Sequence, residues 1–523
     1  MDGQRTQYTR LSHFGPSIKN IIFRRLCMKK VIMILIDAIM PDALENSIKA
    51  GKAKALKFLM ENGYYDSKLV TAFPTMTASV DCTLMTGVYP DQHKVPGLIW
   101  YHPEEKRIVD YVNGSKTTLS LGIKNTANDV LVELNEKHLN KETKTIYEEL
   151  AEQGKTAGAI NFIIHRGFQK YELKPPFLFN LITRFKLNKR SISGPELLSI
   201  GAFVKPSLPG RKLVWNWNQS LFNKYGINDR YAIEVTKYII EAGRQPDFLM
   251  IYLPNHDHYL HKHINHPLES IKKVDQNLEK ILDTFGDWNK AIEQNTFIIL
   301  GDHGQTEIGK EQNHNIDLDY LLRDYQIPPI GQRVKEEHEA IFANNERMVY
   351  IYPLKKDIQK RLVNTLLAEE NIDFIAWKEN KTVKVANANG AELTFSKGKE
   401  SYYIDPYHQK WDVEGDLTIL DITLEKNQLH FGQFPDALSR LYGALYSQNI
   451  PVIVANAKPH FEFISKTFPT HLGGGSHGSL NYTDSIVPLL VAGAEKNPPT
   501  PMRVVDLKNY VLQLLNSTST SIG

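Results

Sequence analysis

The sequence predicts a doubly wound α/β fold built on a mostly parallel sheet. Three short apolar runs carry this prediction, at residues 31–36, 248–252 and 297–300. Continuous apolar runs of this length are typical of strands that are buried on both faces, as in parallel sheets. An amphipathic helix is expected between the second and third strands, over residues 268–285. In such folds the functional side chains lie just beyond the carboxyl ends of the strands.

The composition is that of a large globular protein. The 523 residues carry a formal net charge of +3, with 42% hydrophobic and 23% charged residues. A charge so close to neutral gives no reason to expect nucleic acid as a stable partner. Cys27 and Cys82 are the only cysteines, so neither a disulfide framework nor a thiolate zinc site is predicted. Any bound metal must therefore be held by histidine and carboxylate groups.

The distribution of apolar residues bears on the cellular location. No apolar run reaches the ~18–20 residues that a membrane-spanning helix requires. Residues 1–28 are polar and basic and lack the apolar centre of a signal peptide. We therefore expect a cytoplasmic protein without a membrane span, with residues 1–28 as a peripheral extension.

The chain is expected to divide into a core and inserted segments. We assign residues 29–315 and 450–515 to the α/β core. A cap-like insertion is expected at about 165–225, where the composition becomes aromatic and rich in proline.

Residues 316–449 are expected to belong partly to the core and partly to a β-rich insertion. A strand over 349–352 would extend the core sheet. The small insertion is placed at about 380–430, because residues 382–385 alternate between polar and apolar side chains and an Asn-Gly turn follows at 389–390.

Ionisable side chains follow two of the predicted strands directly. Asp37 ends the run 31–36, and Asp302 and His303 follow the run 297–300 between two glycines. A rigid strand with glycine freedom on both sides is suited to hold such groups in a site. The structural alternative is that each aspartate caps the helix that follows it.

Further candidates come from a helix, a loop and a helix start. Asp257 and His261 are four residues apart, so one helical turn would place them on a common side. His477 lies in a glycine-rich loop, which allows close approach of the backbone to a ligand. Thr77 is expected near the start of a helix that ends at Gly87, where free N–H groups favour an anion. Its structural alternative is an ordinary N-cap.

These side chains have the chemistry of a site for two metal ions. Three aspartates and three histidines without sulfur suit zinc first and manganese as the alternative. Two ions ~4 Å apart stabilise both the attacking and the leaving oxygen of a displacement at phosphorus. A threonine hydroxyl bound to such an ion is activated as a nucleophile.

The order and spacing of these motifs resemble the alkaline phosphatase superfamily, most closely its type I phosphodiesterase/nucleotide pyrophosphatase branch. The similar motifs are the strand ending in Asp37, residues 73–77 and 86–90, Asp257-x-x-x-His261, residues 301–304 and residues 476–478. The resemblance implies an alkaline-phosphatase-like core with insertions that shape the substrate pocket.

The resemblance also implies a role for each residue. Asp257, His261 and His477 would hold one metal ion. The other ion would be held by Asp37, Asp302, His303 and Thr77, with Thr77 as the nucleophile.

One departure from the family pattern concerns the substrate. The family has an asparagine that helps to hold the phosphoryl oxygens, and an ungapped count from Thr77 reaches Leu98 instead, with Asn113 as a possible replacement. We predict an enzyme that hydrolyses phosphodiester or pyrophosphate bonds in a small phosphate ester, through a phospho-threonine at Thr77. The alternatives are a phosphomonoesterase or phosphonate hydrolase on the same scaffold and, after these, a non-catalytic metal-binding protein.

Overall fold

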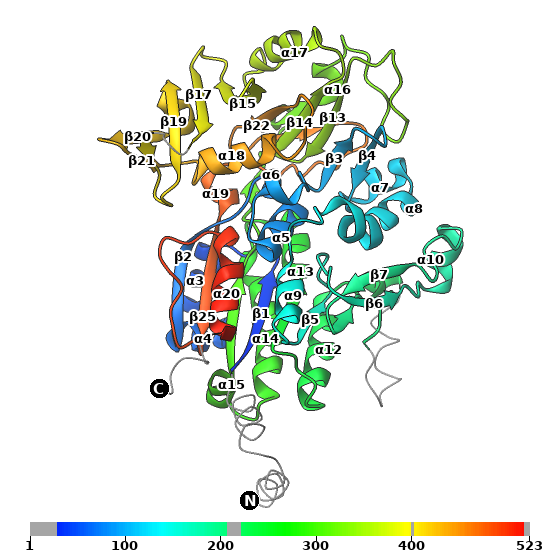
Figure 1. The fold of residues 1–523 in the computed structure, drawn as a ribbon, viewed down its shortest axis with the longest axis vertical. Helices are drawn as coiled ribbons and strands as arrows, with labels where there is room; N and C mark the ends of the chain where they lie inside the picture. Colours follow the sequence, from blue (N-terminus) through cyan, green and yellow to red (C-terminus); the bar gives the residue numbers. More distant parts are fainter. Residues whose placement is uncertain (1–28, 207–220, 399–401, 517–523) are drawn as a thin grey trace, which may run out of the picture.

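The centre of the molecule is a seven-stranded sheet with the strand order β2-β25-β10-β1-β9-β5-β8 (Figure 1). The computed structural model describes residues 29–206, 221–398 and 402–516. The predicted extension 1–28 and residues 207–220 of the predicted insertion lie outside these ranges. The strands are β1 (Lys30–Ile36), β2 (Gly63–Val70), β5 (Ala157–Ile160), β8 (Leu197–Ser199), β9 (Phe248–Leu253), β10 (Asn295–Leu300) and β25 (Ile486–Ala492).

Most strand pairs in this sheet are parallel. β1 pairs in parallel with β10 and β9, so that Ile34 lies opposite Ile299 on one side and Ile251 on the other. β5 pairs in parallel with β9 and β8, whereas β25 runs antiparallel to β10 and β2. The predicted doubly wound, mostly parallel α/β fold is confirmed. β8 belongs to the predicted insertion and forms one edge of this sheet.

Helices cover both faces of this sheet. Side chains alternate along each strand, so a strand that is apolar throughout presents apolar side chains on both faces. Val31, Met33 and Leu35 of β1 pack into one core, and Ile32, Ile34 and Ile36 pack into the other. The first core includes α5 (Thr77–Thr86), α9 (Ile146–Glu152) and α20 (Leu507–Asn516). The second includes α3 (Pro41–Lys49), α4 (Lys54–Glu61), α12 (Asp229–Glu241) and the predicted amphipathic helix, α14 (Pro267–Asp283).

A second, ten-stranded sheet lies above the first in the view of Figure 1. The strand predicted at 349–352 is β14, and it belongs to this second sheet, so the prediction that it extends the core sheet is wrong. β22, from the segment assigned to the core, pairs with β14 and β15. The strands are β13 (Ala340–Asn345), β14 (Met348–Pro353), β15 (Ile372–Glu379), β16 (Thr382–Ala386), β17 (Glu392–Lys397), β18 (Tyr403–Ile404), β19 (Lys410–Gly415), β20 (Ile422–Glu425), β21 (Gln428–Phe431) and β22 (Ile453–Ala457).

The predicted β-rich segment at 380–430 therefore forms the outer half of this larger sheet. The local sequence pattern specifies strands correctly, but it does not specify which sheet they join, because pairing depends on distant segments. The division of the chain into domains stays a prediction.

Shorter elements connect and flank the two sheets. None of the helices in the described ranges is long and apolar enough to cross a bilayer. The helical elements are α6 (Pro90–His93), α7 (Ser115–Leu121), α8 (Ile123–Asn128), η2 (Asp129–His138), α10 (Phe177–Ile182), η3 (Leu221–Gly226), α13 (Asn255–His263), α15 (Trp288–Gln294), η4 (Gln312–His314), α16 (Leu318–Leu321), α17 (Ile358–Leu367), η5 (Leu417–Leu420), α18 (Ala437–Leu445), α19 (Tyr482–Ser485) and η6 (Val504–Asp506). The remaining strands are β3 (Ile99–His102), β4 (Arg107–Asp110), β6 (Gln169–Glu172), β7 (Ser191–Gly194), β11 (Thr306–Glu307), β12 (Asn315–Asp317), β23 (Glu462–Ile464) and β24 (Gly475–Ser476).

Candidate active site

Three side chains meet at the carboxyl ends of β1 and β10, and we call Asp37, Asp302 and His303 the inner group. His303 Nε2 lies 3.4 Å from Asp37 Oδ1 and 3.4 Å from Asp302 Oδ2. These three atoms are buried, and none of them has a hydrogen-bond partner among the described residues. Neither aspartate side chain caps a helix: the N-cap of α3 is Met40, and Asp302 Oδ1 accepts from Ala38 N and His303 N, at 3.1 and 3.0 Å.

The inner group fits a divalent cation. Three electron-pair donors that are buried without a partner are costly, and a bound cation satisfies all three together. Burial raises the pKa of Asp37 well above its usual range, and the nearby carboxylates of Asp302 and Asp257 raise it further. The ring orientation is also suitable, because His303 Nδ1 lies 3.1 Å from the Gly304 carbonyl. A carbonyl only accepts, so Nδ1 carries the proton and Nε2 keeps its lone pair.

Asp257, His261 and His477 form a second cluster, which we call the outer group. Asp257 and His261 lie one turn apart on α13, as predicted, with His261 Nε2 3.3 Å from Asp257 Oδ2. His477 comes from the glycine-rich loop, and its Nε2 lies 3.9 Å from Asp257 Oδ1. Both histidines donate from Nδ1 to carbonyl oxygens, of Gly475 at 2.8 Å and of Thr75 at 2.7 Å. Nε2 is therefore the ring nitrogen that each histidine would offer to a metal ion.

The two groups adjoin one another. The rings of His303 and His477 are stacked, with centroids 3.7 Å apart and planes 10° apart. Asp257 also offers a ligand atom within 4.8 Å of ligand atoms of Asp37 and His303. The fold thus brings the six predicted ligand side chains, which span residues 37–477, into one cluster.

Thr77 is the first residue of α5, and its side chain is partly exposed. The N-cap of α5 is Met76, so Thr77 is not the cap of this helix, and Gly87 ends the helix at φ 69° as predicted. The residues just before α5 are bonded to the loop that carries His477. The Thr75 carbonyl accepts from His477 Nδ1, and Thr75 Oγ1 accepts from Gly478 N. In the described part of the chain no hydrogen bond engages the Thr77 hydroxyl, which leaves it available to a ligand.

Four neighbours of the two groups were not predicted from the sequence. Tyr252 donates to Asp37 Oδ2, and Gln305 donates to Asp257 Oδ1. The buried Glu346 carboxylate accepts from Ser476 Oγ at 2.9 Å and from His477 N at 3.2 Å. His471 stacks on His261 with ring centroids 4.4 Å apart. Tyr252 and Gln305 lie a few residues from a predicted ligand in the sequence, which could have indicated them. Glu346 lies between β13 and β14 of the second sheet, far in sequence from every predicted ligand, so no local pattern indicates it.

Glu346 also contributes to the charge balance of the outer group. Burial lowers the pKa of His261, but the carboxylates of Asp257 and Glu346 outweigh burial and raise this pKa to about 10. Burial would raise the pKa of Glu346, but His477, His471 and His261 lower it to about 2. Glu346 is therefore an anion that stabilises positive charge at the outer group.

The amide of the proposed replacement for the family asparagine already makes a hydrogen bond in the protein interior. Asn113 is buried, and its Nδ2 donates to the Asn344 carbonyl at 3.0 Å. A different cation acts on the site from η3: the pKa of Lys224 is lowered by burial, and the charges of Asp257 and Asp37 oppose that shift. The charge of Lys224 thus interacts favourably with one carboxylate of each group.

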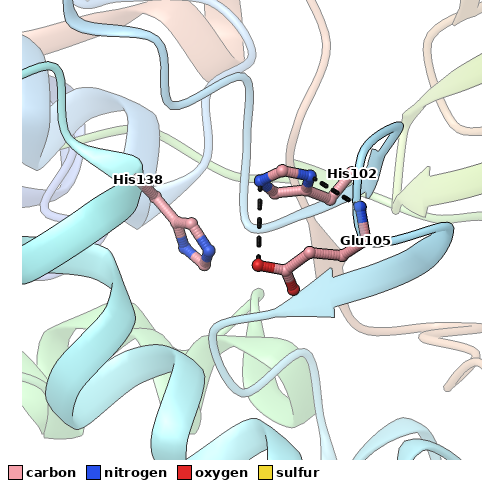
Figure 2. Close-up of side chains that lie close together, drawn as sticks. All are labelled: His102, Glu105 and His138. Atoms are coloured by element: carbon pink, nitrogen blue, oxygen red, sulfur yellow. Dashed lines mark hydrogen bonds and ion pairs between the residues drawn. The ribbon is translucent and has the colours of Figure 1, made fainter.

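His102, Glu105 and His138 form a separate cluster on the β3–β4 hairpin and η2 (Figure 2). His138 Nε2 is buried without a partner, but His102 Nε2 is 3.9 Å from the Glu105 carboxylate, and its Nδ1 accepts from Glu105 N at 3.4 Å. Nε2 of His102 therefore carries the proton. Glu105 also pairs with Arg107 and Lys137. Two cations on the carboxylate and a protonated His102 Nε2 disfavour a metal ion here.

The fold is shared with known hydrolases. Murine ectonucleotide pyrophosphatase/phosphodiesterase 5 is similar with a TM-score of 0.54 and 16% identity, over 93% of this chain and 95% of that chain. The human protein of the same name gives 0.54 and 15%, and an inactive murine variant in complex with AMP gives 0.53 and 15%, with the same coverage. A search of curated proteins returns no match. The structure thus has the alkaline-phosphatase-like α/β fold.

The sequence assigns the chain within this class. A model of the type I phosphodiesterase/nucleotide pyrophosphatase family matches residues 31–480, and the chain belongs to this family. It is a hydrolase that acts on phosphoric esters. The predicted resemblance is confirmed, and the matched range includes all seven predicted site residues.

Proposed function

We propose that the protein hydrolyses phosphodiester or pyrophosphate bonds of a small phosphate ester, with two divalent ions and through a phospho-threonine at Thr77. The observation that supports this most directly is the inner group, in which three buried donor atoms without partners converge. Asp37, Asp302, His303 and Thr77 would hold one ion, and the outer group would hold the other. Nitrogen and oxygen ligands without sulfur suit zinc first and manganese second.

The proposed reaction has two displacements. Bound ions supply stabilisation of the phosphoryl oxygens and lower the pKa of a coordinated hydroxyl. In the first displacement Thr77 Oγ1 bonds to phosphorus, the ester P–O bond breaks, the hydroxyl proton passes to solvent, and the leaving oxygen takes up a proton. In the second, a water oxygen bonds to phosphorus and the phosphorus–Oγ1 bond breaks. One water proton passes to solvent and Oγ1 takes up a proton, which restores the Thr77 hydroxyl. The free N–H groups at the start of α5 favour the anionic phosphoryl group.

Lys224 is proposed as the substrate contact that replaces the family asparagine. The favourable interaction of its charge with Asp257 and Asp37 supports a place for Lys224 near the phosphoryl group. A lysine contributes as a point charge, unlike an asparagine amide. Substrate selection is therefore expected to depend on the insertion as well as on the sheet.

The test compares kcat/KM for bis(p-nitrophenyl) phosphate and p-nitrophenyl phosphate on zinc- and manganese-loaded protein. A diester preference of about 100-fold, which corresponds to about 2.7 kcal/mol, is expected. Thr77→Ala should abolish turnover with the metal content unchanged, and Thr77→Ser is the matched control that keeps a hydroxyl. Turnover by Thr77→Ala would contradict the nucleophile assignment.

The second candidate is a phosphomonoesterase or phosphonate hydrolase, which Leu98 at the family's asparagine position favours. A preference for the monoester would select it. A non-catalytic metal-binding protein would bind metal without turning over either substrate. A cytoplasmic location and the absence of a stable nucleic-acid partner stay predictions.

A further inference from the structure

A short segment of the insertion carries a continuous exposed apolar surface, which we call the apolar tip. Its members are on α10 and the turn that follows it. The fractional exposures are 75% for Phe177, 48% for Leu178, 55% for Leu181, 46% for Ile182 and 49% for Phe185. The rings of Phe177 and Phe185 are in contact, with centroids 6.4 Å apart. Soluble surfaces rarely gather large apolar side chains in this way, so the apolar tip is a candidate binding surface.

The apolar tip is held on a firm base. On the inner side of α10, Phe179 packs edge-to-face on Phe203 and Tyr225, with centroids 5.0 and 5.4 Å away. Asn180 is buried and its Nδ2 donates to the Pro175 carbonyl at 2.9 Å. In Figure 1, α10 projects at the margin of the molecule, beyond the β6–β7 hairpin. The apolar side chains are therefore directed outward by an anchored element rather than left over from an incomplete core.

Basic side chains surround the apolar tip in the sequence. Between residues 168 and 190 the only acidic residue is Glu172, and all of the basic residues are exposed. They are Lys170, Lys174, Arg184, Lys186, Lys189 and Arg190. Within the described ranges, no carboxylate forms an ion pair with Lys174, Arg184, Lys186 or Lys189.

A basic cavity of about 310 Å³ adjoins the apolar tip, between α8 and the segment after α10. Its cationic lining consists of Arg107, Lys124, Lys186 and Arg190. Its carboxylate, Asp129, is already paired with Arg107 at 2.7 Å. Lys124 and Lys186 both line this cavity, and the neighbouring ammonium of Lys186 lowers the pKa of Lys124. Two ammonium groups that line one cavity form a site that a bound anion would stabilise.

We propose that the apolar tip and the basic cavity together dock the protein on an anionic phospholipid bilayer. The apolar tip would enter the boundary between headgroups and acyl chains, and the basic cavity would receive an anionic lipid headgroup. The combination of exposed Phe and Leu side chains with flanking Lys and Arg is what interfacial membrane binding requires. An apolar protein surface would be complementary to the apolar tip alone. An anionic bilayer is complementary to both the apolar tip and the basic cavity. Docking of this kind needs no membrane-spanning helix.

The test is flotation of the full-length, metal-loaded protein with vesicles. Vesicles of phosphatidylcholine with phosphatidylserine are compared with vesicles of phosphatidylcholine alone. We expect binding to the anionic vesicles that is at least tenfold tighter and that weakens as salt screens the charges. Phe177→Ser with Leu181→Ser, and separately Lys124→Glu with Lys186→Glu, should each weaken this binding tenfold or more.

Matched controls come from surfaces of the second sheet. Leu424, 40% exposed on β20, and the exposed Lys360 on α17 supply Leu424→Ser and Lys360→Glu, which should leave vesicle binding unchanged. Hydrolysis of a soluble substrate should be unaffected in all variants, which shows that they fold.

Three results would overturn the proposal. The first is a vesicle result that does not depend on the proposed surface: equal binding to both kinds of vesicle, or binding that both double variants retain. The second is concentration-dependent self-association that the Phe177 and Leu181 substitutions abolish, without vesicle binding, which would assign the apolar tip to a second copy of the chain. The third is stabilisation by inorganic phosphate that depends on Lys124 and Lys186, without vesicle binding, which would assign the basic cavity to a soluble anion.

Discussion

The inner and outer groups have the same kinds of ligands but different surroundings. Asp302 and His303 are completely buried, and their partners come from the ends of neighbouring parallel strands. In the outer group the side chains of Asp257 and His261 are 18% and 17% exposed and lie on a helix, with Glu346 and His471 behind them. The inner group therefore depends on its own three side chains, whereas water and neighbouring residues can compensate in the outer group.

The largest expected loss of activity follows removal of a buried carboxylate of the inner group. Asp302→Ala should lower kcat/KM by about 10³-fold or more, about 4 kcal/mol, because Asp302 is completely buried and water does not reach its position. His261→Ala should cost less, about 10–100-fold, since water can reach the vacated position. Steady-state kinetics with measured metal content checks both variants. Equal losses in the two would contradict the difference between the groups.

A smaller effect is expected at Lys224, which interacts with both groups from the insertion. Lys224→Met removes the charge while keeping a long side chain, and kcat/KM should fall about 10–50-fold with the metal content unchanged. Lys262→Met, at an exposed position of α13, serves as the control. If Lys224→Met retains full activity, the phosphoryl contact lies elsewhere.

The outer group is expected to respond to loss of the Glu346 charge. Glu346→Gln keeps the shape and the bond from Ser476 but removes the anion beside His261 and His477. Groups that support metal ligands typically contribute 10–100-fold to metal affinity, so the affinity for one of the two ions should fall by about this factor. Titration calorimetry measures it. An unchanged affinity at both sites would show that Glu346 has only a packing role.

The smallest effect concerns stability after chelation. In the metal-free protein the pKa of Asp37 is raised by burial and by Asp302 and Asp257, so the folded state binds a proton more tightly than the unfolded state. Stability should then fall as the pH rises above about 4, the unfolded pKa of aspartate. The loss begins near the unfolded pKa of aspartate and ends at the raised pKa of Asp37 in the folded state. Thermal unfolding with EDTA, repeated after metal is restored, measures it, and a metal-free protein that gains stability with pH would contradict this account.

The sequence by itself determined the α/β class, the three central strands and the side chains that follow them. A buried strand has a short apolar pattern that is local, and the residue after it is placed by the strand itself, so Asp37, Asp302 and His303 could be found by counting. The turn of α13 likewise fixes Asp257 against His261. Each of these features is specified by side chains within about ten residues of one another in the sequence.

The tertiary structure decided what lies between distant segments. β14 and β22 look like core strands, but they pair in the second sheet, because strand partners are chosen by packing rather than by local pattern. Glu346 reaches His477 across 131 residues, and Tyr252 reaches Asp37 across 215. The exposure of the apolar tip also depends on the fold, since the sequence of 177–185 does not specify which of its apolar side chains face solvent. Long-range contacts are set by the packing of the whole chain, and no short stretch of sequence contains them.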